Sequence, residues 1–229
     1  MQRQHTKPKN SYNLEIKDII PLTQNQRRTF NHYKIDKNLL LHGMAGTGKT
    51  FCALYLALLD ILSYKSTKNK IIIIRSAVPT RDLGFLPGSL KEKLKQYETP
   101  YKNICTEILN RGDAYEILKT KDIISFMSTS FIRGNTFDDT IIIVDEIQNL
   151  NFHELDSIIT RTGDNSRIIF SGDFRQSDLI KEQERKGLLD FIKVLDKMSS
   201  FRKIEFNIED VVRSGLVKDY LIAKHSVFT

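Results

Sequence analysis

Residues 38–50 leave this 229-residue chain few possible folds. They begin with a short apolar stretch, Asn38-Leu39-Leu40-Leu41-His42, which is typical of a buried β-strand. The next eight residues read Gly-Met-Ala-Gly-Thr-Gly-Lys-Thr, and the apolar segment that follows, residues 51–62, has the length of a helix. The pattern Gly-x-x-x-x-Gly-Lys-Thr between a strand and a helix predicts a loop that wraps around a phosphate group.

Each part of this loop has a physical role in holding a phosphate. Glycines allow backbone N–H groups to converge on an anion, and the start of the next helix adds free donors and the positive end of its dipole. We expect Lys49 to reach the β- and γ-phosphates of a nucleotide, and Thr50 to offer its hydroxyl to Mg²⁺. The expected nucleotide-binding residues of the loop are Gly43, Met44, Ala45, Gly46, Thr47, Gly48, Lys49 and Thr50.

A second apolar stretch ends in two carboxylates. Residues 140–144, Thr-Ile-Ile-Ile-Val, predict a buried strand, and Asp145 and Glu146 follow it directly. Acidic residues often follow buried strands simply as turn formers, but a phosphate-binding loop upstream requires a metal partner. We therefore expect Asp145 to hold Mg²⁺, directly or through water, and Glu146 to orient the attacking water or accept its proton.

Strand patterns alternate with helix patterns along the chain. This alternation predicts an α/β fold with a mostly parallel central sheet and helices on both of its faces. Pro100 is expected to break one helical pattern into two helices. The further strands are expected at residues 70–75, 123–126, 167–170 and 203–206, and the further helices at residues 23–28, 90–97, 101–110, 152–160, 181–197 and 216–223.

The N-terminal segment is basic. The first 37 residues hold eight Lys or Arg and three Asp or Glu, so five of the seven net positive charges lie there. Such an excess favours an encounter with a polyanion, but a solvated basic tail without a partner is equally compatible with it. We expect residues 1–21 to form a basic tail with a possible edge strand over residues 12–20, and residues 22–229 to form the folded domain.

Composition excludes several other classes of protein. The chain has two cysteines without a Cys-x-x-Cys pair and five scattered histidines, which argues against a disulfide framework or a structural zinc site. We recognise no signal peptide and no apolar run of about 18 residues, the length that a membrane span needs. The expected location is therefore the cytoplasm.

Two glutamines have both a structural and a functional interpretation. Gln26 stands three residues after Thr23, where it either completes the capping box of a short helix or reads the edge of an adenine base through its amide. Gln176 follows the strand at residues 167–170, on the rim where α/β sheets bind ligands, and is either a γ-phosphate sensor or a plain loop residue.

Taken together, the motifs resemble the PhoH family of P-loop ATPases, whose core is similar to the first RecA-like domain of superfamily-one helicases. The resemblance extends over residues 22–223, and its more specific parts are Leu-Gly-Phe-Leu-Pro-Gly at residues 83–88 and Asp-Val-Val-Arg at residues 210–213. The other parts are the loop at residues 43–50, Arg133-Gly134, Val-Asp-Glu-Ile-Gln-Asn at residues 144–149, and Ser-Gly-Asp-Phe-Arg-Gln-Ser-Asp-Leu at residues 171–179.

This resemblance implies a three-layer P-loop NTPase fold of the RecA-like type and assigns roles in an ATP site. Gln26 then corresponds to the adenine-reading residue, and Gln148 and Gln176 to residues that couple the γ-phosphate to nucleic acid. Arg213 or Arg133 is implied as a charge-stabilising arginine, and we expect it to act across a subunit boundary, because the chain is too short to hold a second RecA-like domain.

The resemblance also implies partners. Members of the family are associated with RNA metabolism and with ring-shaped assembly, so the implied partners are RNA or single-stranded DNA and further copies of the chain, for instance in a hexameric ring. Phe85, Tyr97, Tyr101 and Phe131 are candidates to stack on bases, with the alternative that aromatic residues at helical spacing more often belong to a core. So compact a version would fit a bacteriophage protein acting in the host cytoplasm.

Departures from the family pattern keep two alternatives open. Arg75-Ser76 replaces the usual Arg-Pro, Ile147 replaces an alanine and Ser214-Gly215 replaces His-Pro, all in loops that could bind nucleic acid. One alternative is an ATP-driven assembly factor or nucleotide switch without nucleic acid. The other is a P-loop kinase of small molecules, which is less favoured because Asp145-Glu146-x-Gln148 suits activation of water.

Overall fold

The computed structural model describes residues 14–63, 65–76, 90–132, 134–174 and 182–228. Within these ranges a six-stranded parallel sheet has the strand order β3-β2-β4-β5-β1-β6. Its strands are β1 (Asn38–Gly43), β2 (Lys70–Arg75), β3 (Ile124–Ser128), β4 (Thr140–Val144), β5 (Arg167–Gly172) and β6 (Phe201–Phe206). The helices are α1 (Gln24–Lys34), α2 (Lys49–Ile61), α3 (Leu90–Leu109), α4 (Ala114–Thr120), α5 (Phe152–Ile159), α6 (Glu182–Asp196) and α7 (Gly215–Phe228).

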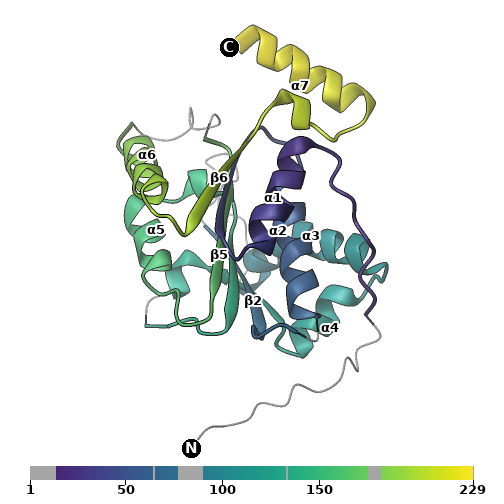
Figure 1. The fold of residues 1–229 in the computed structure, drawn as a ribbon, viewed down its shortest axis with the longest axis vertical. Helices are drawn as coiled ribbons and strands as arrows, with labels where there is room; N and C mark the ends of the chain where they lie inside the picture. Colours follow the sequence, from purple (N-terminus) through teal and green to yellow (C-terminus); the bar gives the residue numbers. More distant parts are fainter. Residues whose placement is uncertain (1–13, 64, 77–89, 133, 175–181, 229) are drawn as a thin grey trace, which may run out of the picture.

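Helices cover both faces of the sheet, which confirms the three-layer α/β fold expected from the sequence. Helices α5 and α6 lie against one face, and α1, α2, α3 and α4 lie against the other (Figure 1). The isoleucines of β2 are shared between the two cores. Ile71 and Ile73 point into the core under α1–α4, whereas Ile72 and Ile74 point into the core under α5 and α6, because successive strand residues face opposite sides.

The topology gathers the ends of β1, β4 and β5 at one edge of the sheet. Strand β5 lies between β1 and β4, with Leu41 paired to Ser171 and Val144 paired to Phe170. Because all strands are parallel, the segments that follow their carboxyl ends meet at the same edge. The glycine-rich loop after β1 and the two acidic residues after β4 are therefore neighbours in space.

The N-terminal segment departs from the sequence-based expectation. We expected a strand within residues 12–20, but residues 14–20 form none. Leu14 is buried in the core, the Lys17 N–H donates to the carbonyl of Ile108 in α3, and the Ile19 N–H donates to the hydroxyl of Tyr55 in α2. The segment lies on helices, whose backbone groups are already paired, so it has no strand edge on which to form a ladder.

Helices α3 and α4 also differ from the expectation. Pro100 lies inside the single helix α3 and does not divide it, because the buried side chains of Tyr101, Cys105 and Ile108 hold the second half against the core. This packing outweighs the one backbone hydrogen bond that proline removes. Helix α4 was not assigned from the sequence, since seven residues are too few for a clear periodic pattern.

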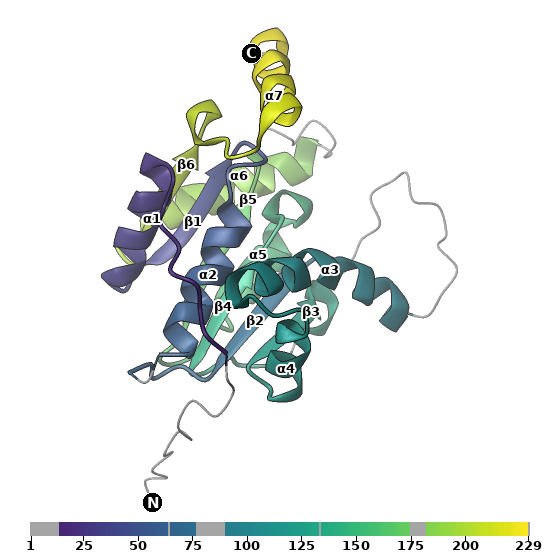
Figure 2. The same cartoon turned by 90° about the vertical axis from the view of Figure 1, so that its right-hand side faces the viewer.

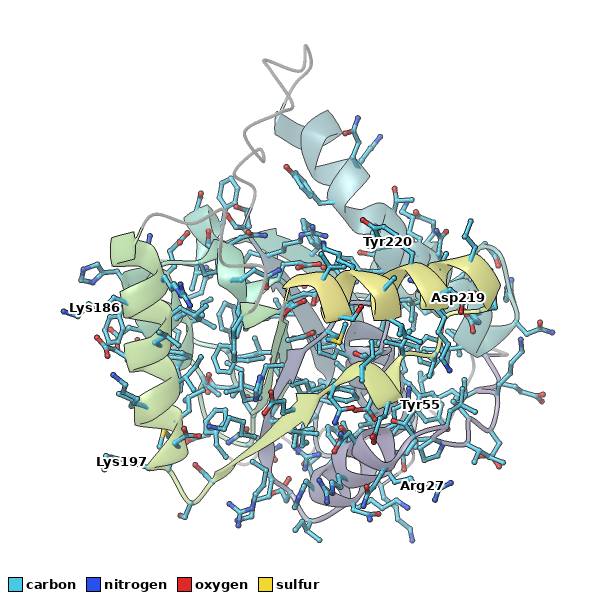
Figure 3. All side chains as sticks on the ribbon, turned by 90° about the horizontal axis from the view of Figure 1, so that it is seen from above. Arg27, Tyr55, Lys186, Lys197, Asp219 and Tyr220 are labelled. Carbon is cyan, nitrogen blue, oxygen red and sulfur yellow. The ribbon has the colours of Figure 1, made fainter. Side chains whose placement is uncertain are left out.

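Helix α7 lies at the end of the molecule where β6 ends (Figures 1 and 2). It leaves several large apolar side chains exposed. The exposed fractions of Leu216, Val217 and Tyr220 are 83%, 51% and 62%. Viewed along the vertical axis of Figure 1, α7 crosses over the end of the sheet with Asp219 and Tyr220 on it (Figure 3). Across the described ranges, every helix is too short or too polar to pass through a bilayer.

Candidate nucleotide site

The loop between β1 and α2 follows a path that requires glycine. Gly43 has a φ of +118°, and a Cβ atom added to it would lie 1.9 Å from the carbonyl oxygen of Phe206. The Met44 N–H donates to that same oxygen at 3.0 Å, which fastens the loop to the end of β6. Gly48 has a φ of +83° and ends the loop immediately before α2. The first bond between turns of the helix runs from Cys52 N to Gly48 O, so the preceding N–H donors are free for an anion.

Lys49 lies inside the curve of the loop. Its Nζ donates to the carbonyl oxygens of Gly43 at 2.8 Å and Met44 at 2.7 Å, and the residue is 8% exposed. Burial lowers the pKa of Lys49, while Asp173, Glu146 and Asp145 act in the opposite direction. A phosphate is an acceptor that could replace the two carbonyl oxygens without moving the helix.

Thr50 and Asp145 join the two motifs. Thr50 Oγ1 donates to Asp145 Oδ1 at 3.0 Å, and Asp145 is 4% exposed. Magnesium prefers hard oxygen ligands and is usually held by one or two carboxylates together with substrate phosphates. A hydroxyl and a carboxylate oxygen side by side, next to a phosphate-binding loop, fit that ion.

Glu146 is held by Gln148. The Glu146 backbone is left-handed, with a φ of +54°, and its carboxylate accepts a hydrogen bond from Gln148 Nε2. Gln148 Oε1 in turn accepts from the Asp173 N–H at 3.1 Å, which connects the glutamate to the segment after β5. Burial raises the pKa of Glu146 and Asp145 raises it further, against the influence of Arg75, Gln148 and Lys49.

Gln26 lies beside the glycine-rich loop. The hydroxyl of Thr23 accepts from the Gln26 N–H, so half of the expected capping box is present. The Gln26 side chain does not complete it: Nε2 donates to the Thr47 carbonyl at 3.1 Å and Oε1 accepts from the Leu22 N–H at 2.8 Å. The amide therefore lies next to the phosphate-binding loop, as an adenine-reading residue would.

The Asp-Val-Val-Arg segment packs on the same loop. The Val212 N–H donates to the Gly46 carbonyl at 3.1 Å, and a Cβ atom added to Gly46 would lie 3.0 Å from Arg213 Cγ and 3.3 Å from Leu221 Cδ1. Asp210 fixes the segment to α1 by accepting from Asn25 Nδ2 at 2.7 Å. Burial acts against the charge of Asp210, but hydrogen bonds, that of Asn25 foremost, lower its pKa overall.

Some expected site residues lie outside the described ranges. These are Arg133, Gln176 and the Leu-Gly-Phe-Leu-Pro-Gly stretch at residues 83–88, including Phe85. The other expected site residues come together around the glycine-rich loop. They are Gln26, Lys49, Thr50, Asp145, Glu146, Gln148 and Arg213.

Two residues near the site have positions there that the sequence did not predict. Tyr101 was expected to stack on bases, which is wrong: it is 1% exposed, and its hydroxyl donates to Asp145 Oδ2 at 2.9 Å. Arg75 ends β2; although burial opposes its charge, Tyr101, Glu146 and Asp145 raise its pKa. The position of Arg75 at a strand's carboxyl end is a signal that could have identified it, whereas the role of Tyr101 depends on how α3 packs.

The fold and this geometry define the chain as a P-loop NTPase of the RecA-like type with a nucleotide-binding core. The family model described as PhoH-like protein matches residues 18–224, and the chain therefore belongs to the PhoH family.

Relatives of known name agree with this assignment. The PhoH-like protein of Bacillus subtilis (strain 168) is 35% identical over 210 residues, covering 90% of this chain and 63% of the relative. The PhoH-like protein of Mycobacterium leprae (strain TN) is 33% identical over 212 residues, covering 90% of this chain and 58% of the relative. This chain thus spans less than two thirds of the length of either.

A solved structure shares the fold. The large terminase of a thermophilic bacteriophage, in complex with ADP, superimposes with a TM-score of 0.52 and covers 89% of this chain and 50% of the terminase chain. The sequences are only 9% identical, so the likeness extends to the fold alone.

Proposed function

We propose that the chain is a Mg²⁺-dependent ATPase that cleaves the γ-phosphate of ATP. The observation that carries this proposal is the 3.0 Å contact between Thr50 Oγ1 and Asp145 Oδ1. This contact supports the proposal because, if the two oxygens hold Mg²⁺, the metal would lie beside the phosphate-binding loop and near the carboxylate of Glu146, as phosphoryl transfer to water requires.

The residues of the site have separate roles in this reaction. Lys49 moves from the carbonyls of Gly43 and Met44 to the phosphates and balances the charge on the transferred phosphoryl group. Thr50 and Asp145 would hold Mg²⁺, which would supply positive charge to the phosphates. Glu146 orients the attacking water or accepts its proton once Gln148 releases the carboxylate.

Gln26 and Arg213 complete the nucleotide site in this proposal. The amide of Gln26 reads the adenine edge, and Arg213, whose side chain lies against Gly46, contributes positive charge beside the loop. Arg133, the alternative to Arg213 as the charge-stabilising residue, stays a prediction, as does Gln176 as a γ-phosphate sensor.

A test follows phosphate release from ATP with Mg²⁺. Lys49→Ala should abolish it, since residues 43–50 contain no other cation. Glu146→Gln should bind ATP and turn over poorly, because the amide keeps the size of the side chain and loses its basicity. Wild-type turnover by Glu146→Gln would overturn the role of Glu146. Phosphorylated acceptor in place of free phosphate would identify a small-molecule kinase instead.

A second proposal is that the ATPase acts on RNA or single-stranded DNA. Arg75 pairs in register with Ser128, and Phe131, three residues further on, is 49% exposed at the same edge of the sheet. The Arg75 guanidinium also lies 5.5 Å from the ring centre of Tyr97. Proteins that bind single strands use cations to contact the phosphates and aromatic rings to stack on the bases. ATPase rates with RNA, with single-stranded DNA and without polymer separate this proposal from an assembly factor or nucleotide switch.

We further propose a homo-oligomer, for instance a hexameric ring, in the cytoplasm. The exposed apolar side chains of α7 support contact with another copy. Sedimentation with and without ATP tests this proposal. Residues 22–229 form the ATPase domain in this view, and the described part of the preceding tail packs on α2 and α3.

A further inference from the structure

The two oxygens of the Asp145 carboxylate have different partners. Oδ1 accepts from Thr50 Oγ1 at 3.0 Å, and Oδ2 accepts from the phenol of Tyr101 at 2.9 Å. Thr50 is the last residue of the glycine-rich motif and lies in the first turn of α2, whereas Tyr101 belongs to α3. Each oxygen of the carboxylate is thus held by a hydroxyl from a different helix, and Oδ1 is the one paired with the phosphate-binding motif.

We propose that Tyr101 is a positioning residue for the metal site: its hydroxyl occupies Asp145 Oδ2 and so presents Oδ1, beside Thr50, as the oxygen that binds Mg²⁺. This inference rests on the proposed function, because it takes Asp145 to be the metal ligand. It assigns Tyr101 no contact with ATP or with the reacting atoms.

The surroundings of Tyr101 suit this role. The residue is 1% exposed, its ring lies 5.8 Å from that of Phe126 in β3, and Cys105, one turn further along α3, is fully buried. A ring held by packing has little rotational freedom left to lose, so its hydroxyl is a fixed donor. Partners of this kind typically change metal affinity by about 10- to 100-fold when removed.

A positive charge lies beside this cluster. Arg75, which lies close to Tyr101, Asp145 and Glu146, supplies the positive charge that allows two adjacent carboxylates to stay near a buried phenol.

Metal binding can be measured without turnover. Electron paramagnetic resonance follows Mn²⁺ binding to the protein with ADP present, and ADP binding without metal is measured separately. Tyr101→Phe should weaken Mn²⁺ binding by about 10- to 100-fold and leave metal-free ADP binding unchanged. A merely structural role would not separate these two affinities.

Tyr33→Phe is a matched control. Tyr33 is also buried, and its hydroxyl donates to a carboxylate, Asp60 Oδ2, at 3.0 Å, but it belongs to α1 and pairs near the C-terminal end of α2. This variant should keep the wild-type affinity for Mn²⁺. Equal Mn²⁺ affinity in Tyr101→Phe and wild type would overturn the inference and leave the proposed ATPase intact. A wild-type protein that binds neither ADP nor Mn²⁺ would overturn both.

A second measurement retains the hydroxyl in case Tyr101→Phe does not fold. With 3-fluorotyrosine at position 101, the fluorine resonance should shift when Mg²⁺ is added to the ADP-bound protein. The same label at position 33 should not shift. No shift at position 101, with metal binding shown independently, would overturn the inference.

Discussion

The side chain of Arg213 lies against Gly46 of its own chain, so close that a Cβ atom on Gly46 would be 3.0 Å from Arg213 Cγ. From the sequence we expected this arginine to act across a subunit boundary. The contact instead favours action within one chain. We predict that Arg213→Ala lowers the rate of phosphate release by about 10³-fold or more, the range for a charge-stabilising arginine.

Mixing experiments check that prediction. Inactive Lys49→Ala and Arg213→Ala proteins, combined under conditions in which subunits exchange, should stay inactive, because neither contains a complete site. Recovery of activity in the mixture would show that the arginine acts in a neighbouring subunit. Arg111→Ala is a suitable control, since Arg111 pairs with Asp113 on the exposed turn between α3 and α4.

The path of the phosphate-binding loop depends on Gly43. Alanine there would have to keep a φ of +118° and would place Cβ 1.9 Å from the Phe206 carbonyl oxygen. We expect Gly43→Ala to lower the free energy of unfolding by at least about 2 kcal/mol, measured by urea denaturation.

Gly112→Ala is the matched control for Gly43→Ala. An added Cβ at Gly112 would meet no atom within 4 Å, so its effect should stay within about 0.5 kcal/mol. Equal stability of the two variants would show that the loop can take another path.

The main motifs of the site could be predicted from the sequence. Gly43, Lys49 and Asp145 belong to short patterns whose chemistry is local, so the sheet edge at which they meet follows from strand order and polarity alone. The network around Asp145 could not be predicted in this way. It depends on the packing of α3, and the sequence had suggested a break in that helix at Pro100.

For Gln26, the sequence predicted the backbone contact but not the partner of the side chain. Its spacing from Thr23 predicted a cap, and the backbone half of that cap is present. The side chain turns to Thr47 instead, because the glycine-rich loop lies within reach of α1 only in the folded protein. Local patterns therefore gave the elements and the main motifs, whereas tertiary contacts decided the partners of individual side chains.

We predict that His42 makes the free energy of unfolding depend on pH. Its ring stacks on Phe174 with 4.8 Å between ring centres, and burial lowers the pKa of His42 from 6.5 to about 4. Between these values the unfolded chain binds a proton that the folded protein does not, so stability falls as the pH decreases from 6.5 to 4. The contribution is at most about 3.5 kcal/mol, since one pKa unit corresponds to about 1.4 kcal/mol.

Urea denaturation across this range tests the contribution of His42. His42→Phe keeps an aromatic ring beside Phe174 and removes the titration, so its stability should depend less on pH than that of wild type between pH 6.5 and 4. Parallel curves for the two proteins would mean that His42 is protonated in the folded state at the same pH as in the unfolded chain.

We predict that a bound single strand stacks a base on the ring of Phe131. The ring is 49% exposed after β3, and stacking a base on an aromatic ring contributes about 1–3 kcal/mol. Phe131→Ala should therefore weaken binding of single-stranded RNA by about 5- to 150-fold, measured by fluorescence anisotropy with an ATP analogue and Mg²⁺ present. Tyr220→Ala removes a similarly exposed ring on α7 and should change the affinity little.

The salt dependence separates stacking from charge. Phosphate contacts make the logarithm of the affinity fall linearly with that of the salt concentration, with a slope of about −0.7 per contact for single strands. Removing an uncharged ring should lower the affinity at every salt concentration and leave that slope unchanged. A changed slope would mean that Phe131→Ala has displaced cationic residues nearby. No detectable binding to wild type, even at low salt, would favour the assembly factor or nucleotide switch.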